Sequence, residues 1–266
     1  METFVLALVF LVVSTLFSML GLGGGVLYVP ILLFAGYSMA EAPAISLILI
    51  TATSLSALHH FSRNSKIDWK LALVMDPPTD IMAFVGGYFS AVVPEMFLRT
   101  TLIVVMLLVG VMMLRRGPGE AALEPREKRW WLWRREFHGV HYAVNLPLVL
   151  TATSVIGLLS GMLGITGGVI KLPIMVLLCG VPMDIAVATS TVMVAITAIC
   201  GVTGHAVNGT IDWRTGLVLA IAAVAGGLIG SRISVKADKA KLKKIFGGVV
   251  LLIAIQMSIR LIFKHL

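Results

Sequence analysis

A ten-residue glycine-rich segment occurs twice in this chain and constrains its fold more than any other feature. Residues 21–30 read GLGGGVLYVP and residues 164–173 read GITGGVIKLP, so five of ten positions are identical at a constant offset, from Gly21 to Gly164. Each copy follows a long apolar stretch and precedes a short one. Because glycine permits sharp turns and leaves backbone amides uncovered by side chains, the pattern predicts two glycine corners between helices.

The duplication extends well beyond these corners. With one inserted residue, the second half aligns Ser46 with Ser190, Thr53 with Thr197, and Ile67-Asp68-Trp69 with Ile211-Asp212-Trp213. Self-similarity over such a length predicts two structural repeats. We expect an N-terminal transmembrane repeat over 3–114, a basic linker over 115–142 and a C-terminal transmembrane repeat over 143–263.

Composition places these repeats in a membrane. Hydrophobic residues make up 58% of the 266 residues, charged residues make up 13%, and the mean hydropathy is +0.99. Soluble domains carry about 25% charged residues. We therefore expect an all-α polytopic membrane protein, with no soluble catalytic domain and no cofactor. The expected apolar segments are 3–20, 24–36, 43–62, 70–92, 97–114, 143–163, 168–180, 184–207, 214–234 and 245–263.

Two of these segments, 24–36 and 168–180, are too short to span a bilayer comfortably. Each has about 13 residues, or roughly 20 Å of helix. Short or interrupted segments at matching places in two halves indicate a transporter binding site between repeats. If all ten segments cross, each repeat has five, and the repeats are inverted, with short broken helices at the glycine corners.

The positive charges predict an orientation. Sixteen of the 21 Lys and Arg residues lie in the loops 63–70, 115–135 and 232–244. Since cytoplasmic loops carry an excess of Lys and Arg, we expect these loops on the cytoplasmic side of the cytoplasmic (inner) membrane, and both termini outside. The net charge of +8 has the same explanation. We therefore expect the lipid bilayer and not nucleic acid as a partner, and the sequence also allows a homo-oligomer.

The glycine corners are candidate anion sites. Amides at the start of a helix, together with the helix dipole, favour negative charge. Lys171 lies three residues beyond the second corner, where a buried charge would complete an anion site, although a lysine snorkelling to the interface is the alternative. Segments 43–62 and 184–207 carry small polar residues at helical spacing. These residues either line the substrate pathway or only allow the helices to pack closely. The candidate substrate-binding residues are Gly23, Gly24, Gly25, Thr166, Gly167, Gly168, Lys171, Ser46, Ser190, Thr53 and Thr197.

Three titratable residues are candidates for proton coupling: His60, Asp76 and Asp80. A plain interfacial role is the alternative for His60. The two aspartates flank Pro77-Pro78 and have no counterpart in the second half, so they either relay protons or mark a helix break. Cys179 and Cys200 have neither metal-ligand nor disulfide spacing, and no metal site is expected.

The two copies of Gly-x-x-Gly-Gly-x-x-x-x-Pro, each followed by a serine in the next helix, resemble the sulfite exporter TauE/SafE family. The repeated Ile-Asp-Trp and the Gly-Gly pairs 86–87 and 226–227 add to the resemblance, which covers roughly residues 3–263. It implies a cytoplasmic-membrane transporter, usually an exporter, of sulfur-containing anions such as sulfite or organosulfonates. Gly23 of the first corner is Thr166 in the second, so the resemblance does not make the two sites equal.

The leading hypothesis is therefore a secondary transporter of a small sulfur oxyanion. A non-transporting scaffold that recruits partners through the basic linker explains that linker but not the paired corners. An intramembrane hydrolase built on Ser160, in the segment GLLSG, lacks a matching buried histidine base. No Walker A motif occurs, so we expect an ion gradient, a proton gradient or uniport and not direct ATP use.

Overall fold

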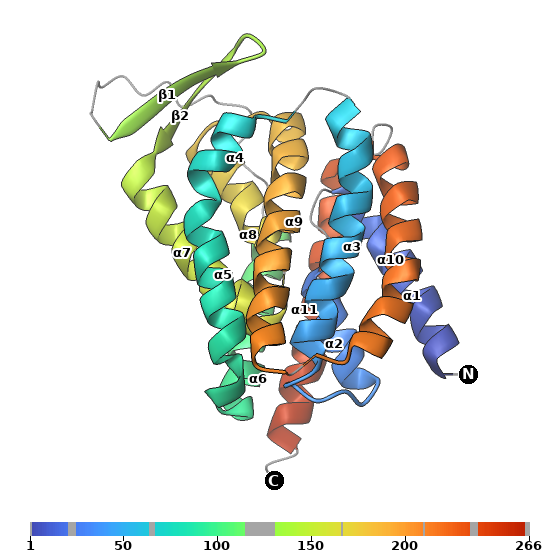
Figure 1. Cartoon of the computed structure of the whole chain (residues 1–266). Coiled ribbons are helices and arrows are strands. Elements are labelled where there is room, and N and C mark those ends of the chain that lie inside the picture. The colour runs from blue at the N-terminus through green and yellow to red at the C-terminus, as the bar shows by residue number, and fades with distance from the viewer. Residues whose placement is uncertain are drawn as a thin grey trace.

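Helices fill almost the whole structure, a computed structural model (Figure 1). It describes residues 2–20, 25–63, 67–114, 131–165, 167–209, 211–234 and 239–263. The helices are α1 (Glu2–Met19), α2 (Gly25–Phe34), α3 (Ala42–Arg63), α4 (Trp69–Met75), α5 (Pro77–Phe89), α6 (Glu95–Leu114), α7 (Leu146–Leu163), α8 (Gly168–Pro173), α9 (Met183–Val207), α10 (Trp213–Ile233) and α11 (Lys239–Phe263). A 3-10 turn (Ser90–Val92) follows α5 and a π-helical turn (Ile174–Leu178) follows α8.

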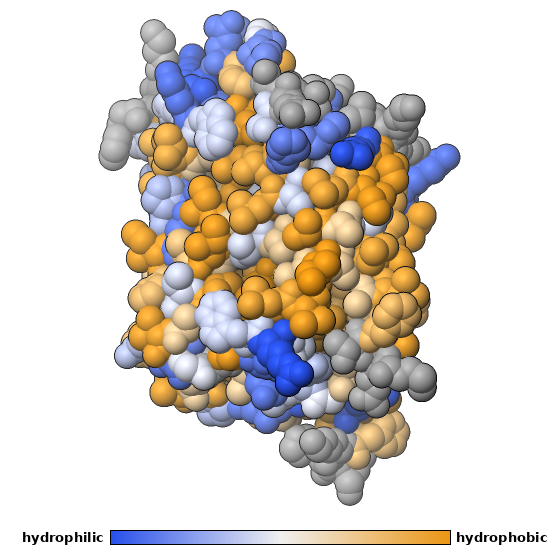
Figure 2. All heavy atoms as spheres, turned by 45° about the vertical axis from the view of Figure 1, so that its right-hand side comes forward, coloured by the Kyte–Doolittle hydropathy of each residue, from blue (hydrophilic) through white to orange (hydrophobic). Residues whose placement is uncertain are grey.

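The helices match the expected apolar segments closely, and the expected membrane class is confirmed. Within the described ranges, six helices are long and apolar enough to cross a membrane: α3, α6, α7, α9, α10 and α11. Figure 2 shows a broad hydrophobic band between two hydrophilic ends. Exposed Leu73, Val104, Ile221 and Leu252 are examples of its side chains. Such a surface is stable in lipid and unstable in water, so the chain is an all-α polytopic membrane protein.

Two expected segments are interrupted. The stretch 70–92 divides into α4 and α5 at Asp76, because Pro77 begins the second helix and has no amide hydrogen to continue the first. The stretch 168–180 is α8 followed by the π-helical turn, and Pro173 stands at their junction. Short helices therefore follow both glycine corners.

The linker differs from expectation, because part of it forms a β-hairpin. Strands β1 (Leu132–Phe137) and β2 (Val140–Asn145) pair antiparallel. Both turn residues, His138 and Gly139, have positive φ angles of 51° and 74°. This conformation suits the right-handed twist of a two-residue hairpin. Residues 115–130 of the linker lie outside the described residues.

The bundle has two distinct ends. The hairpin projects from one, hereafter the hairpin end, where α3 and α10 end and α4 and α11 begin (Figure 1). These helix termini bound the other basic loops, so the described parts of all three basic regions share one end. Both chain termini lie toward the opposite, terminal end. Which end faces the cytoplasm stays a prediction.

Glycines allow the helices to pack closely. α5 packs on α7 and α9, and α10 packs on α1 and α3. A Cβ at Gly87 of α5 would lie 2.6 Å from the carbonyl oxygen of Gly201 on α9. Similarly, a Cβ at Gly227 of α10 would lie 2.6 Å from the carbonyl oxygen of Thr53 on α3. Since these neighbours are backbone atoms, neither position accommodates a larger residue without moving a helix.

Gly87→Ala should therefore lower the free energy of unfolding by about 1–3 kcal/mol, the usual cost of overpacking. Gly248→Ala is the matched control, because a Cβ there meets no atom within 4 Å and alanine favours helix. Thermal unfolding of the purified proteins in detergent measures both. Equal unfolding temperatures for the two variants would contradict the close approach of α5 and α9.

Candidate functional site

A buried ionic cluster joins α8, α9 and the α4–α5 break. The side chain of Lys171, on α8, is fully buried, and its Nζ lies 2.5 Å from Asp76 Oδ1. Lys171 also donates to Thr197 Oγ1 at 3.1 Å, and Thr197 donates to Asp80 Oδ1 at 2.8 Å. We call Asp76, Asp80, Lys171 and Thr197 the lysine cluster.

The helix break positions the two carboxylates. Asp76 ends α4 and precedes Pro77, while Asp80 lies in the first turn of α5. Four residues apart, they share one side of the chain and both reach Thr197. The sequence left a relay and a helix break as alternatives for these aspartates. The break occurs where the sequence indicated it, and the same residues contact Lys171.

Fully ionised, the lysine cluster would carry one net negative charge. It holds one ammonium group and two carboxylates, and Asp76 is only 3% exposed. Among the described residues, Asp76 Oδ2 has no hydrogen-bond partner. Ionisable groups at membrane depth pair with one another and mark ion pathways or proton relays. Because Lys171 is completely buried beside Asp76, it does not snorkel to an interface.

The second corner lies against the same lysine. A Cβ at Gly167 would be 3.5 Å from Lys171 Cε, so the lysine chain runs back past the corner from which α8 starts. Gly168, the first residue of α8, is also buried. Gly164 ends α7 with a φ angle of +65°, which is strained for residues other than glycine.

The first repeat has a neutral equivalent. Tyr28 occupies the position of Lys171, and its hydroxyl lies 3.0 Å from Thr53 Oγ1, the counterpart of Thr197. Both side chains are fully buried. The two halves thus use the same geometry, a helix after the corner contacting a threonine of the next long helix, but only the second carries charge.

The remaining predicted residues are dispersed. Ser46 donates to the carbonyl oxygen of Gly164 at 2.6 Å, which joins α3 to the second corner. Ser190 donates to the carbonyl oxygen of Val187 in its own helix at 3.0 Å. Gly25 is buried at the start of α2, and His60 lies in the last turn of α3. Gly23, Gly24 and Thr166 lie outside the described residues.

A second buried ion pair was missed at the sequence level. Asp68 caps α4 by accepting from the amides of Lys70 and Leu71, and Arg135 of the hairpin donates to it at 2.5 and 2.6 Å. Tyr142 also donates to Asp68. Asp212, the aspartate of the second Ile-Asp-Trp, likewise caps α10 in the second half. No basic partner could be read from the sequence.

This pair predicts a pH-dependent stability. Burial raises the pKa of Asp68, but the hydrogen bonds from Arg135 and Tyr142 outweigh burial and hold it below its ordinary value. A lowered pKa means that ionised Asp68 stabilises the fold above the ordinary value of about 3.9. That contribution is lost as the pH falls through the folded-state value.

Arg135→Gln should therefore lower the unfolding temperature near neutral pH, and the difference from the unsubstituted protein should shrink in acid. Arg134→Gln is the control, because Arg134 is an exposed neighbour on the same strand. Thermal unfolding in detergent across an acidic pH series gives the comparison. A difference independent of pH would mean that Arg135 acts by packing rather than by charge.

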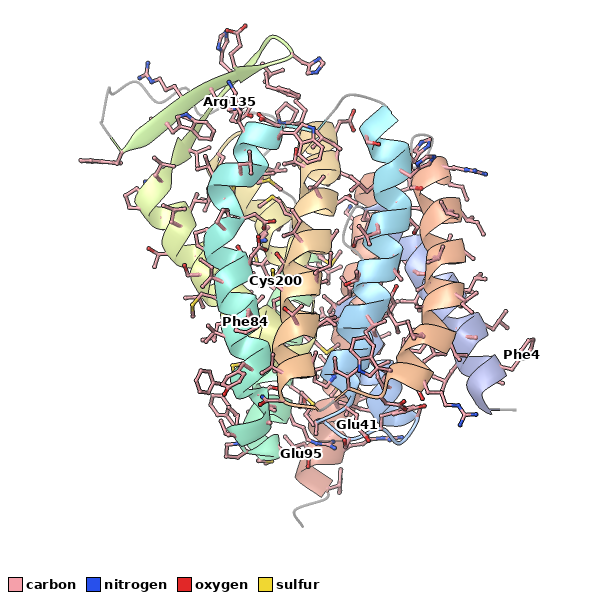
Figure 3. All side chains as sticks on the ribbon, in the orientation of Figure 1. Phe4, Glu41, Phe84, Glu95, Arg135 and Cys200 are labelled. Carbon is pink, nitrogen blue, oxygen red and sulfur yellow. The ribbon has the colours of Figure 1, made fainter. Side chains whose placement is uncertain are left out.

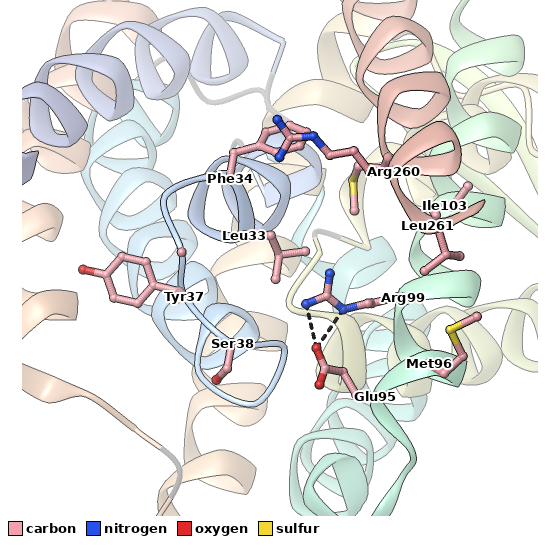
Figure 4. A pocket seen from close by; sticks show the side chains of 12 residues that line it. Leu33, Phe34, Tyr37, Ser38, Glu95, Met96, Arg99, Ile103, Arg260 and Leu261 are labelled. Atoms are coloured by element: carbon pink, nitrogen blue, oxygen red, sulfur yellow. Dashed lines mark hydrogen bonds and ion pairs between the residues drawn. The ribbon is translucent and has the colours of Figure 1, made fainter. Parts of the chain in front are cut away.

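A cavity lies between α2, α6 and α11 (Figure 4), and its lining residue Glu95 is at the terminal end of the bundle (Figure 3). Its volume is about 720 Å³. Arg260 Cζ lies 4.8 Å from the ring centroid of Phe34, and Arg99 pairs with Glu95 at 2.6 Å. These three charged side chains leave one net positive charge on the lining. The cavity therefore presents guanidinium groups at the end opposite the basic loops.

The six spanning helices, the lipid-compatible surface and the buried ionic cluster define a multi-pass α-helical membrane protein with a polar interior site. A family model described as "Sulfite exporter TauE/SafE" matches residues 6–257, and the chain belongs to this family.

The relatives agree with this class. The chain is 26% identical to "Probable membrane transporter protein YunE" of Bacillus subtilis, over 99% of this chain and 100% of that protein. It is 27% identical to "Probable membrane transporter protein YfcA" of Escherichia coli K12, over 91% of this chain and 82% of that protein. No solved structure matches the chain significantly. Family and relatives together indicate a membrane transporter rather than an enzyme.

Proposed function

We propose that this protein is a secondary transporter that exports small sulfur-containing anions such as sulfite or organosulfonates across the cytoplasmic membrane. The observation that carries the proposal is Lys171, a fully buried lysine beside a glycine corner in a member of the sulfite exporter family. Ammonium groups and uncovered helix amides both stabilise oxyanions where water is excluded. The lysine cluster is the proposed centre of the site.

The inverted repeats belong to the same proposal. Helix contacts support it, because they recur when the halves are exchanged: α1 packs on α10 as α7 packs on α5, and α10 packs on α3 as α5 packs on α9. In addition, α3 packs on α9 and α6 packs on α11, and each of these pairs consists of equivalent helices from the two repeats. Alternating access would come from one repeat moving against the other around the site.

Anion flux through proteoliposomes tests the function. Purified protein is reconstituted, and efflux of sulfite, thiosulfate, methanesulfonate and chloride is compared with that of protein-free vesicles. We expect flux of the sulfur anions well above flux of chloride. Flux equal to that of empty vesicles for every anion would reject transport and favour the alternative of a membrane scaffold.

The cavity at the terminal end is the proposed outer anion-collecting surface. Arg260→Gln should raise the KM for anion several-fold with little change in kcat, because a charge at an entrance raises local anion concentration without entering the transport step. The effect should diminish at high salt. An unchanged KM at low salt would remove the cavity from the pathway. Lys241→Gln, at the opposite end, is the control.

A further inference from the structure

The charge balance of the lysine cluster bears on how transport is coupled. When fully ionised, the two carboxylates and one ammonium group leave one negative charge uncompensated inside the bundle. In this state Lys171 is paired with Asp76, and an incoming anion meets a site of the same sign. Adding the negative charge of the anion to a buried site that is already negative is electrostatically unfavourable.

A proton on the aspartate pair removes this obstacle. If Asp76 accepts a proton on Oδ2, which has no partner in the described part of the chain, it no longer holds Lys171 as an ion pair. The ammonium group is then available to an anion beside Gly167, past which its side chain runs. Thr197 keeps its contact with Asp80, so the second carboxylate remains hydrogen-bonded.

Among the described residues outside the lysine cluster, no other ionisable group is equally placed to take this role, and within the cluster Asp80 already accepts from Thr197 at 2.8 Å. Cys200, one turn beyond Thr197 on α9, lies within electrostatic reach of the cluster. His205 is further along α9, where its ring nitrogens contact Ser90 and the carbonyl oxygen of Gly161. Asp184 stands in the first turn of α9. Helix α7, which packs along α5, has no titratable side chain within its bounds.

We propose that Lys171 exchanges Asp76 for the transported anion, and that each anion is bound together with one proton taken up by Asp76. This inference rests on the proposed anion transport and adds its coupling. By reciprocal linkage, the proton on Asp76 and the anion each raise the affinity of the site for the other, which favours carrying both in the same direction. In this scheme export is driven by an outward anion gradient, which carries the proton with it. A monovalent anion and one proton then cross together without net charge.

Because the first repeat has Tyr28 in place of a lysine, only the second repeat provides a site for coupled binding of an anion and a proton. The first repeat has the same helix–threonine contact, but its tyrosine and threonine bring no charge. One half of the pseudo-symmetric pair therefore binds the anion and its proton, while the other provides packing. Tyr28→Phe is accordingly the matched control for substitutions in the lysine cluster.

Binding of methanesulfonate to the full-length protein in detergent tests the coupling. This anion stays ionised from mildly acidic to mildly alkaline pH, whereas sulfite itself titrates in that range. On the alkaline side, affinity should fall by about tenfold per pH unit, the dependence for one linked proton. Calorimetry in buffers of different ionisation enthalpy should show uptake of one proton per anion.

Asp76→Asn should bind methanesulfonate independently of pH and without proton uptake, because the carboxyl group proposed to take up the proton is gone and Asp80 remains hydrogen-bonded to Thr197. Asp76→Glu should restore the pH dependence, and Tyr28→Phe should retain it. Binding by the unsubstituted protein that is independent of pH overturns the coupling but leaves the proposed function standing. A persistent pH slope in Asp76→Asn overturns the role of Asp76.

If a variant fails to fold, the pH slope and proton uptake of the unsubstituted protein decide the question. Flux gives a second readout: methanesulfonate should accumulate on the alkaline side of a pH gradient, and a clamped membrane potential should leave its flux unchanged. Accumulation driven by potential alone overturns the coupling. Absence of both binding and flux for all sulfur anions overturns the proposed function itself.

Discussion

Lys171→Met should reduce the flux of sulfite and methanesulfonate through proteoliposomes at least about thirtyfold. Truncating one partner of a buried charge interaction costs roughly 2–5 kcal/mol, and each 1.4 kcal/mol is tenfold. Lys171 is fully buried and held by Asp76 and Thr197, so no water replaces its ammonium group when an anion must shed its own hydration. Methionine fills a similar volume without the charge.

The control for this substitution is Lys244→Met, which removes an exposed lysine of α11. It changes the net charge of the protein by the same amount. We expect its flux to stay within about twofold of the unsubstituted protein, since exposed charges act weakly through solvent. Equal loss of flux in both variants would show that total charge rather than the lysine cluster controls transport.

Much of the fold followed from residue patterns. Apolar length predicted the long helices to within a few residues, apart from α11, and the glycine corners predicted the short helices after them. These features are local: each depends on hydrophobic runs and on residues that permit or stop a helix. The hairpin was missed, although its His138-Gly139 turn was a usable sign. It was missed because strands rich in charged residues, within a basic linker, have a sequence pattern like that of an irregular loop.

The site was predicted as separate residues and not as an arrangement. Lys171, Thr197, Asp76 and Asp80 were each singled out, but the lysine was assigned to the anion alone. Asp76 and Lys171 are separated by 95 residues and Thr197 and Asp80 by 117. Such contacts depend on how α8 and α9 pack against the α4–α5 break, which no local pattern contains. The partnership of Asp68 with Arg135, 67 residues away, was missed for the same reason.

A double substitution separates the stability of the lysine cluster from its function. Lys171→Met alone leaves Asp76 buried without its ion-pair partner, and breaking a buried pair in this way costs about 3–5 kcal/mol. Adding Asp76→Leu removes the orphaned carboxylate. We expect the double variant to recover most of the lost unfolding temperature, because apolar pairs often replace buried ion pairs at little cost.

The double variant should fold but should not transport anions. A site that has lost both its ammonium group and its exchangeable carboxylate can neither attract an anion nor take up the proton proposed to accompany it. Unfolding temperature in detergent and methanesulfonate flux in proteoliposomes are measured on the same preparations. A double variant that is stable and transports at the unsubstituted rate would make the pair of Lys171 and Asp76 purely structural, and the anion path would then lie elsewhere in the bundle.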